Sequence, residues 1–262
     1  MIKSIYTPLS GALAQEKVLD IIANNLANVN TVGYKGESVT FKVLESEPDK
    51  NYNTPLPPAN YKIDLEQLSP LVGNEVNYVG ISNVVRDLSQ GPAIETKNPL
   101  DLMIEGDGYF SVHTRDGIRY TRDGSFSLSV DGALVDRFGN PVLGEKGNIF
   151  VRGNDFEINS LGEVYQNGEL VDRISLYKFE DDSTLEKVGN NHLFYGGDPE
   201  KIKKIDYATL RQGYLEGSNV NAIKNLTAMI LAHRSYESYQ KTIKNFDSMM
   251  DKSSNSIGAV RA

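Results

Sequence analysis

The chain has 262 residues, enough to bury at least one sizeable core, and it contains no cysteine. The lack of cysteine excludes disulfide bonds, thiolate catalysis and zinc sites with sulfur ligands. Its 27 lysine and arginine residues against 35 aspartate and glutamate residues give a net charge of −8. This charge argues against a broad nucleic-acid-binding surface, because basic side chains supply most of the affinity of such surfaces.

The apolar stretches of the sequence are short. None approaches the roughly 18 residues that a membrane-spanning helix requires, so we expect no insertion into a membrane. The first residues also lack the continuous apolar region of a secretory signal, because Gln15, Glu16, Lys17 and Asp20 interrupt it. We therefore expect no cleaved signal peptide.

Residues 1–35 are predicted to form an amphipathic helix and the turn that ends it. After Ile2, apolar residues recur at alternating steps of three and four, interrupted at Glu16, as in the a and d positions of a coiled coil. This N-terminal seam comprises Ile5, Leu9, Ala12, Leu19, Ala23 and Leu26. The helix is expected to end near Asn30, because Gly33 suits the left-handed turn that closes helices.

Residues 36–72 are predicted to be an extended strap. Five of the ten prolines fall between Pro48 and Pro70, and no glycine lies between Gly36 and Gly73. This composition favours a semi-rigid segment with polyproline-like stretches over a flexible linker. The residues Val39, Phe41, Val43 and Leu44 indicate a short strand near its start.

Residues 73–212 are predicted to form an all-β domain, either a meander or a small distorted barrel. Turn dipeptides recur in this part of the sequence, and they favour hairpins. They are Asp107-Gly108, Asp116-Gly117, Asp123-Gly124, Asp131-Gly132, Gly139-Asn140 and Asn167-Gly168. Strands are expected at 109–115, 118–122 and 125–130, with Phe126, Leu128 and Val130 on one face of the last.

Residues 213–262 are predicted to contain a second long helix, which Ser218 or Asn219 can cap. A C-terminal seam, interrupted at Asn225, comprises Ala222, Met229, Ala232, Tyr236, Tyr239, Ile243, Phe246 and Met250. The predicted fold class is therefore α+β, with a discontinuous coiled-coil layer from both ends of the chain and the β-domain inserted between its halves. The seams fit two interpretations, an intramolecular helical hairpin or surfaces that pack on other copies.

Candidate chemistry in the sequence has a simpler structural interpretation. Asp101, Glu105 and Asp107 resemble the paired carboxylates of glycoside hydrolysis, but two of them flank a turn. The spaced Asp-Gly pairs lack the ligand pattern of calcium loops. We therefore expect no catalytic residue, no metal site and no small-molecule substrate.

Histidines and glycines give no further signal of chemistry. His113, His192 and His233 share no metal-ligand spacing, and Gly106 and Gly108 form a lone Gly-X-Gly without a following helix pattern. We expect no cofactor.

Four asparagines crowd the end of the first helix. Capping explains Asn28 and Asn30, but it does not explain Asn24 and Asn25. Amides in packed helices can hydrogen-bond between helices and set their register, and this is the interpretation we favour for Asn24 and Asn25.

Three blocks of sequence resemble the bacterial flagellar rod and hook proteins. Residues 23–35, Ala-Asn-Asn-Leu-Ala-Asn-Val-Asn-Thr-Val-Gly-Tyr-Lys, are similar to the N-terminal signature of that family. The segments similar to its central domain are 98–102, 106–110 and 120–124. The segments similar to its C-terminal helix are 213–216, 218–221 and 234–237.

The resemblance implies an axial subunit of the flagellum, exported by the flagellar type III apparatus and assembled helically with copies of itself and other rod proteins. It implies that the terminal helices form an inner coiled-coil layer around the export channel, in the periplasmic part of the basal body. The residues then expected at the assembly interface are Ile5, Leu9, Ala12, Leu19, Asn24, Asn25, Leu26, Asn28, Asn30, Ser218, Asn219, Met229, Tyr236, Tyr239, Ile243, Phe246 and Met250.

Within that family the length of the chain favours the rod, because hook subunits carry larger insertions. The strap and the run from Asp87 to Pro92 favour the proximal over the distal rod. The alternatives are a distal rod subunit, a self-assembling fibre protein outside flagella, and a carbohydrate-active enzyme.

Overall fold

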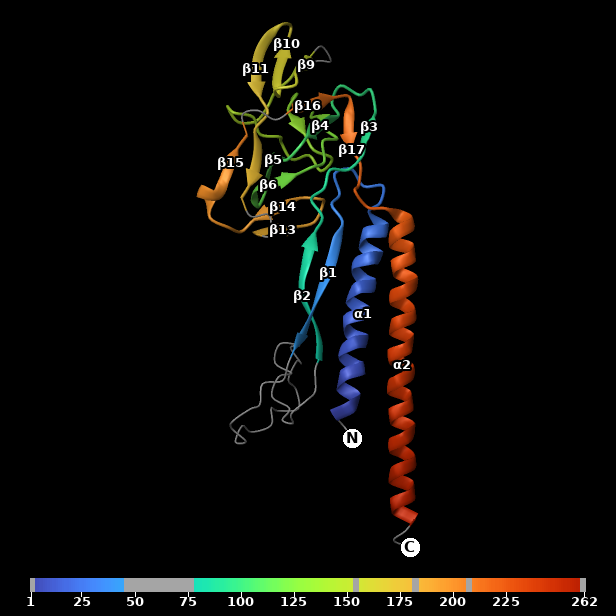
Figure 1. Cartoon of the computed structure of the whole chain (residues 1–262). Coiled ribbons are helices and arrows are strands. Elements are labelled where there is room, and N and C mark those ends of the chain that lie inside the picture. The colour runs from blue at the N-terminus through green and yellow to red at the C-terminus, as the bar shows by residue number, and fades with distance from the viewer. Residues whose placement is uncertain (1–2, 45–77, 153–155, 181–183, 206–208, 260–262) are drawn as a thin grey trace. The chain divides into compact units, whose positions relative to one another are not determined.

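The computed structural model describes residues 3–44, 78–152, 156–180, 184–205 and 209–259 (Figure 1). These residues belong to two compact units, which we treat separately. The helical unit comprises described residues of 1–26, 37–85 and 222–262, and the β-unit comprises those of 27–36 and 86–221. The observed combination of terminal helices and a central β-region confirms the predicted α+β class. The strap predicted after residue 44 lies outside the described residues.

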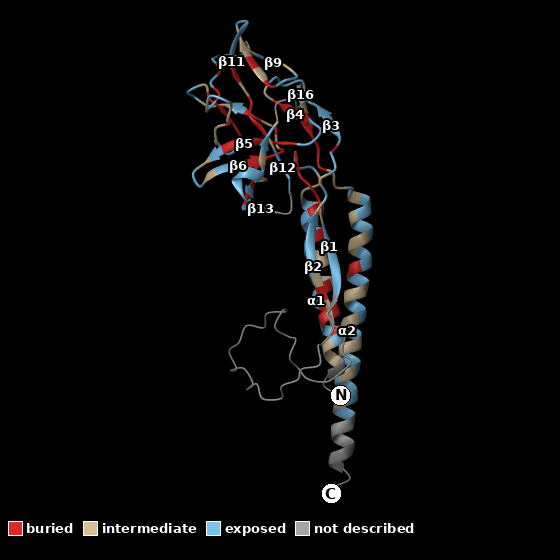
Figure 2. Ribbon diagram, turned by 60° about the vertical axis from the view of Figure 1, so that its left-hand side comes forward, coloured by how far each residue is buried: buried red, intermediate tan, exposed pale blue. Residues whose placement is uncertain are grey.

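The helical unit contains two long helices and a two-stranded ribbon. Helix α1 is Lys3–Ala27 and helix α2 is Ala222–Ala259, and they run side by side in opposite directions (Figures 1 and 2). Strands β1, Glu37–Leu44, and β2, Tyr78–Arg86, pair beside α1, and β1 confirms the short strand expected there. Within the described residues, neither helix has a stretch long and apolar enough to cross a bilayer.

Helix α1 is buried on more than one side. Ala12, Ala14, Ile21 and Ile22 are all at most 8% exposed. The hydroxyl of Ser10 accepts a hydrogen bond from the backbone N–H of Val79 in β2 at 3.3 Å. This burial exceeds a single a/d stripe, because the ribbon and α2 both lie against α1 (Figure 2).

The predicted C-terminal seam lies on the less exposed side of α2. Each of its positions is buried or half-buried, and so is Asn225, whereas most of the intervening residues are exposed. Ala232 is 6% exposed. The three-four spacing of the sequence therefore identified the correct face of the helix.

The β-unit consists of short strands. Its elements are β3 (Ala93–Glu95), β4 (Leu102–Glu105), β5 (Tyr109–Thr114), β6 (Gly117–Thr121), β7 (Ser127–Leu128), β8 (Leu134–Val135), β9 (Phe156–Ile158), β10 (Glu163–Gln166), β11 (Glu169–Arg173), β12 (Leu176–Phe179), β13 (Leu185–Lys187), β14 (Leu193–Tyr195), η3 (Pro199–Lys201), β15 (Ile202–Lys204), β16 (Thr209–Gln212) and β17 (Tyr214–Glu216). The largest sheet has six strands in the order β13-β14-β6-β5-β12-β15. Since β12 pairs with β5 and β14 with β6, this sheet is not a simple meander.

Two apolar clusters form the core of the β-unit. In the larger one, Phe110 is fully buried and meets Phe126 edge to face, with 5.1 Å between ring centroids. The smaller one is aromatic and places Phe179 between Tyr120 and Tyr195. Edge-to-face and stacked ring pairs add roughly 0.5–1.5 kcal/mol each beyond the burial of their area.

Most of the predicted turns occur where the dipeptides indicated. Asn167 and Gly168, between β10 and β11, have φ of 52° and 81°, as a type I′ hairpin turn requires. Gly117, with φ of 107°, closes the hairpin of β5 and β6. These turns are local, so their sequence signals were sufficient.

Two predictions in this region were wrong. Asp123-Gly124 makes no hairpin turn; a Cβ on Gly124 would lie 1.7 Å from the carbonyl oxygen of Leu102, so the glycine permits a close backbone approach. Val130 does not share the buried face of Phe126, because β7 ends at Leu128 and Val130 is fully exposed.

Candidate functional site

The expected assembly residues of the helical unit have different environments. Ala12 and Asn25 are each 5% exposed, whereas Leu9 is 39% exposed and Asn24 is exposed. The half-buried ones are Ile5, Leu19, Leu26, Met229, Tyr236, Tyr239, Ile243, Phe246 and Met250. Half-buried apolar side chains leave surface that can still be covered, so a role in assembly stays a prediction for them.

Asn25 links the end of α1 to the start of β1. Its Nδ2 donates to the carbonyl oxygen of Glu37 at 2.7 Å, and its Oδ1 accepts from the N–H of Glu37 at 2.9 Å. The side-chain amide thus pairs with a backbone peptide as a neighbouring strand would. This local role was not expected from the sequence, which suggested contacts between helices.

After α1 the chain makes a turn at residues 28–31, which belong to the β-unit. The carbonyl oxygen of Asn28 accepts from the N–H of Thr31 at 3.1 Å, and its Oδ1 accepts from the hydroxyl of Thr31 at 3.1 Å. Asn30 is exposed. Gly33 has φ of 66°, which confirms its left-handed conformation. The side chain of Asn28 therefore holds the turn after α1 through Thr31, and capping of the helix by Asn28 stays a prediction.

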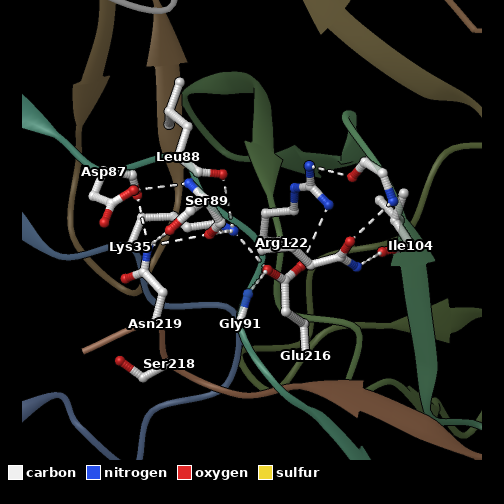
Figure 3. Close-up of polar contacts among 12 residues, drawn as sticks. Lys35, Asp87, Leu88, Ser89, Gly91, Ile104, Arg122, Glu216, Ser218 and Asn219 are labelled. Carbon is white, nitrogen blue, oxygen red and sulfur yellow. Dashed lines mark hydrogen bonds and ion pairs between the residues drawn. The ribbon is translucent and has the colours of Figure 1, made fainter. Parts of the chain in front are cut away.

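A buried ion cluster lies next to this turn (Figure 3). Nζ of Lys35 is 2.5 Å from Oε1 of Glu216, and the two side chains are 5% and 1% exposed. On the other side, NH1 of Arg122 is 3.3 Å from Oε2 of Glu216. One carboxylate therefore pairs with two cations, and the cluster carries a net charge of about +1.

Backbone groups complete the ion cluster. Nζ of Lys35 also donates to the carbonyl oxygens of Leu88 and Ser89, at 3.4 and 2.8 Å. The N–H of Gly91 donates to Oε1 of Glu216 at 3.0 Å. NH2 of Arg122 donates to the carbonyl oxygen of Gly106 at 2.8 Å. Buried charges are tolerated when hydrogen bonds of this kind satisfy them.

Asn219 adds hydrogen bonds beside the ion cluster, to the segments around Gly36 and Asp87 (Figure 3). Its Nδ2 donates to the carbonyl oxygens of Asp87 and Ser89, at 2.8 and 3.1 Å, and its Oδ1 accepts from the N–H of Gly36 at 2.8 Å. The buried Ser218 accepts from the N–H of Val220 through its hydroxyl. Three separate stretches of sequence therefore meet at one asparagine.

Burial lowers the pKa of Lys35, against the opposing effect of the Glu216 carboxylate, which favours the charged ammonium. Breaking a buried pair by removing one partner typically costs about 3–5 kcal/mol. Glu216 is the member shared by both pairs, so its loss would leave two buried cations without a counter-charge.

The ion cluster unites the sequence blocks that resemble the rod and hook family. Lys35 ends the N-terminal block, Arg122 lies in the central block, and Glu216 and Asn219 lie in the C-terminal block. The resemblance marks these blocks in the sequence, but no sequence pattern predicts that Lys35, Arg122 and Glu216 pair. The one signal for this pairing in the sequence is that the three blocks carry both positive and negative side chains within otherwise apolar or turn-forming runs.

A loop at 187–192 contacts the segment that follows α1, at Val32 and Tyr34. Nδ2 of Asn191 donates to the carbonyl oxygen of Val32 at 2.7 Å, and Nζ of Lys187 lies 4.5 Å from the ring centroid of Tyr34. His192 anchors the loop, because its Nε2 is 2.8 Å from Oδ2 of Asp136 and both residues are buried. His192 thus has a structural partner.

The candidate carboxylates are held in separate structural contacts. Asp101 is buried and accepts from Nδ2 of Asn98 at 3.1 Å, whereas the exposed Asp107 pairs with Lys178 at 2.6 Å. Within the described residues, no group of three or more potential ligands is arranged to hold a metal ion.

Three family models match the chain in order. They are described as flagella basal body rod protein (residues 5–35), flagellar hook protein FlgE/F/G D1 domain (103–166) and flagellar basal body rod FlgEFG protein C-terminal (211–256). These matches overlap the N-terminal, the central and the C-terminal block of sequence quoted above.

Relatives match over nearly the whole chain. The flagellar basal-body rod protein FlgF of Caulobacter vibrioides is 34% identical, over 94% of each chain. FlgF of Mesorhizobium japonicum is 29% identical over 98% of each chain. The flagellar basal-body rod protein FlgG of Bacillus subtilis is 32% identical over 96% of this chain and 98% of its own.

Proposed function

Because this chain belongs to the family of flagellar basal-body rod proteins, we propose that it is a structural subunit of the proximal rod, polymerising helically with copies of itself and with related rod subunits. The observation that carries the proposal is the match to FlgF relatives over 94–98% of the chain. A family of structural proteins also accounts for carboxylates and histidines that serve as ion-pair partners.

In this proposal the helices of the helical unit form the inner layer of the rod and line the export channel. The seams pack as a coiled coil, and the β-unit forms the outer layer. The presence of both terminal helices in one compact unit supports this arrangement. Apolar burial along the seams would supply roughly 25 cal/mol per Å² removed from water, shared among many neighbouring copies.

A rod transmits torque, so its subunits need stiffness. The ion cluster supports this role, because it joins the segment that leaves α1 to the segment that leads into α2 within the β-unit. Hydrogen-bonded charge clusters tolerate little displacement, since each buried group depends on its partners.

The subunit would leave the cytoplasm through the flagellar type III export apparatus, and would function where the rod crosses the periplasmic space. Relatives named FlgG, such as that of Bacillus subtilis, keep a distal rod position as the second candidate.

Cryo-electron tomography of flagellar motors in cells that lack this gene tests the proposal, with a complemented strain as control. We expect a rod that is missing or stops at its proximal part, without a hook. A rod that stops only after its proximal part would favour the distal candidate. Complete rods with hooks and normal swimming would overturn both.

A further inference from the structure

Residues 27–36 form a loop whose two ends are held together in the helical unit. Asn25, before the loop, pairs through its side-chain amide with the backbone of Glu37, after the loop, at 2.7 and 2.9 Å. Loops whose ends meet in this way, called Ω-loops, are compact pieces of structure. Residues 27–36 belong to the β-unit, whereas Asn25 and Glu37 belong to the helical unit. We call residues 27–36 the docking loop.

The docking loop is bound through its backbone. The N–H of Gly33 donates to the carbonyl oxygen of Glu216 at 2.7 Å, and the carbonyl oxygen of Tyr34 accepts from the N–H of Asn219 at 3.3 Å. A Cβ atom on Gly33 would lie 2.5 Å from the backbone of Arg122, so the two chains touch there without a side chain between them. The docking loop thus lies on the β-unit as a bound peptide does, with main-chain hydrogen bonds along its length.

The last two residues of the docking loop make its strongest polar contacts. The ammonium of Lys35 pairs with Glu216 in the ion cluster. The N–H of Gly36 donates to Oδ1 of Asn219, and its carbonyl oxygen accepts from the N–H of Asp87, both at 2.8 Å. Hydrogen bonds to charged groups contribute more than neutral ones, so Lys35 is the main polar anchor of the loop.

The apolar core of the β-unit does not include the docking loop. As far as the chain is described, the two apolar clusters consist of residues between Leu100 and Leu210. Burial of apolar surface is the dominant favourable contribution to folding. The docking loop therefore binds at the outside of a core that is complete without it.

The groups that bind the docking loop keep partners when it leaves. Glu216 stays paired with Arg122 and still accepts from the N–H of Gly91. Asn219 keeps its two hydrogen bonds to backbone carbonyl groups. The ammonium of Lys35 leaves with the loop and regains water. Departure of the loop therefore leaves no buried charge without a partner, which is the costly outcome for a buried ion pair.

We propose that the docking loop closes on, and opens from, an otherwise complete β-unit, and that the Lys35–Glu216 pair sets the balance between the two states. In the closed state the segment that follows α1 is bound to the segment that precedes α2. In the open state both units keep their own contacts, and the pairing of Asn25 with Glu37 still holds the ends of the loop together. Proteins open in cooperative parts of this kind. This opening is a property of the single chain and lies beyond the proposed function.

Amide hydrogen exchange of the purified full chain, followed by NMR in a series of low denaturant concentrations, tests the opening. The reporters are the amides of Gly33, Gly36, Asp87 and Asn219, whose hydrogen bonds the opening breaks. We expect them to share one opening free energy, with a smaller dependence on denaturant than the core amide of Leu134, because opening exposes less surface than unfolding. The same free energy and denaturant dependence for reporters and core would overturn the proposal.

A core variant shows whether the β-unit stays folded while the loop opens. Ile149→Val shortens a fully buried side chain and should speed exchange at Leu134 several-fold. The four reporter amides should be unaffected, because Ile149 remains packed in the open state. Equal acceleration of the reporters would overturn the proposal, since they would then exchange only when the whole β-unit unfolds.

Lys35→Met tests the role of the ion pair. We expect exchange at the reporters to become about tenfold faster or more, because the closed state alone loses a hydrogen-bonded charge. The matched control is Lys203→Met, which removes an exposed pair with Glu180 and should leave the reporters unchanged. Unchanged exchange at the reporters in Lys35→Met would overturn the assignment of Lys35 as the anchor.

A milder variant decides the question if Lys35→Met does not fold. Asn191→Gly removes the hydrogen bond to the carbonyl oxygen of Val32, while glycine keeps the left-handed conformation of this residue, with φ of 57°. We expect several-fold faster exchange at the same four reporters. Acceleration confined to residues 187–192 would overturn the proposal. The rod assignment fails separately, through complete rods in the deletion strain.

Discussion

The ring of Tyr239 in α2 lies against the backbone of Gly11 in α1. A Cβ atom on Gly11 would be 2.6 Å from Cζ of Tyr239 and 2.7 Å from Cε1. Gly11 is therefore a contact surface, although it interrupts a helix in which glycine has low propensity. The absence of a side chain lets the two helices approach with an aromatic ring between them.

This contact predicts an unusual sign for Gly11→Ala. In a helix interior the change usually stabilises by about 1 kcal/mol, whereas overpacking a contact costs roughly 1–3 kcal/mol. We expect Gly11→Ala to lower the free energy of unfolding of the helical unit by about 1 kcal/mol. Circular dichroism during denaturant unfolding measures it.

The control is the same substitution in a Tyr239→Ala background, where the ring is absent. There Gly11→Ala should stabilise the chain, because only helix propensity remains. Stabilisation by Gly11→Ala in both backgrounds would show that the ring simply moves aside.

The ion cluster predicts that Glu216 matters more than either of its partners. Glu216→Gln leaves the buried ammonium of Lys35 and the guanidinium of Arg122 without a counter-charge, and should cost about 3–5 kcal/mol. Lys35→Met leaves one complete pair, Arg122 with Glu216, and should cost less. Denaturant unfolding followed by tyrosine fluorescence compares the two.

The matched control is Glu105→Gln, since Glu105 is an exposed carboxylate that pairs with Arg211. Exposed pairs contribute about 0–1 kcal/mol, so this variant should unfold almost as the parent chain does. A larger loss for Lys35→Met than for Glu216→Gln would contradict the proposed balance of charge.

Sequence patterns predicted those elements whose backbone depends on neighbouring residues. The seam of α2, the left-handed Gly33 and the Asn167-Gly168 turn are of this kind. Asp123-Gly124 has the same local signal, but its glycine is required by the carbonyl group of Leu102 in β4. A dipeptide cannot distinguish a turn from such an approach.

Long-range pairing was beyond the sequence. Lys35 and Glu216 are 181 positions apart, and no periodicity links them. Asn25 pairs with the backbone of Glu37, a partner that its place in a run of asparagines did not indicate. In both cases the residue type was informative, since buried polar groups need partners, but the identity of the partner depended on the tertiary fold.

Asp136 predicts an acid-sensitive contribution to the stability of the β-unit. Burial alone would raise the pKa of its carboxyl group, but hydrogen bonds from His192, Asn140 and the N–H of Phe138 outweigh this and hold the pKa below the ordinary 3.8. The unfolded chain therefore binds more protons just below pH 3.8. The stabilisation is complete above that pH and is lost as the pH falls through the lowered pKa.

Asp136→Asn should remove this dependence. We expect the variant to be less stable than the parent chain at neutral pH, and the difference in unfolding free energy to shrink on acidification below pH 3.8. Denaturant midpoints across a pH series measure it, with Asp131→Asn at an exposed carboxylate as control. A difference that stays constant with pH would mean that Asp136 acts only through its shape and hydrogen bonds.

Ile243 tests which of the two interpretations of the seam is correct. Ile243→Asp places a charge on the half-buried face of α2, and we expect it to abolish swimming while the β-unit unfolds normally, because Ile243 belongs to the helical unit. Gln240→Asp adds the same charge at an exposed position and should leave swimming intact.

The helix content of the purified Ile243→Asp chain then separates the interpretations. If the seam packs within one chain, the variant should lose helix content as a monomer, because the charge disrupts an existing contact. If the seam packs on other copies, helix content should be retained while assembly is lost. Normal swimming with Ile243→Asp would contradict both interpretations of the seam. A carboxylate placed in a packed helical seam should cost about 2–5 kcal/mol, because it loses water without gaining a partner.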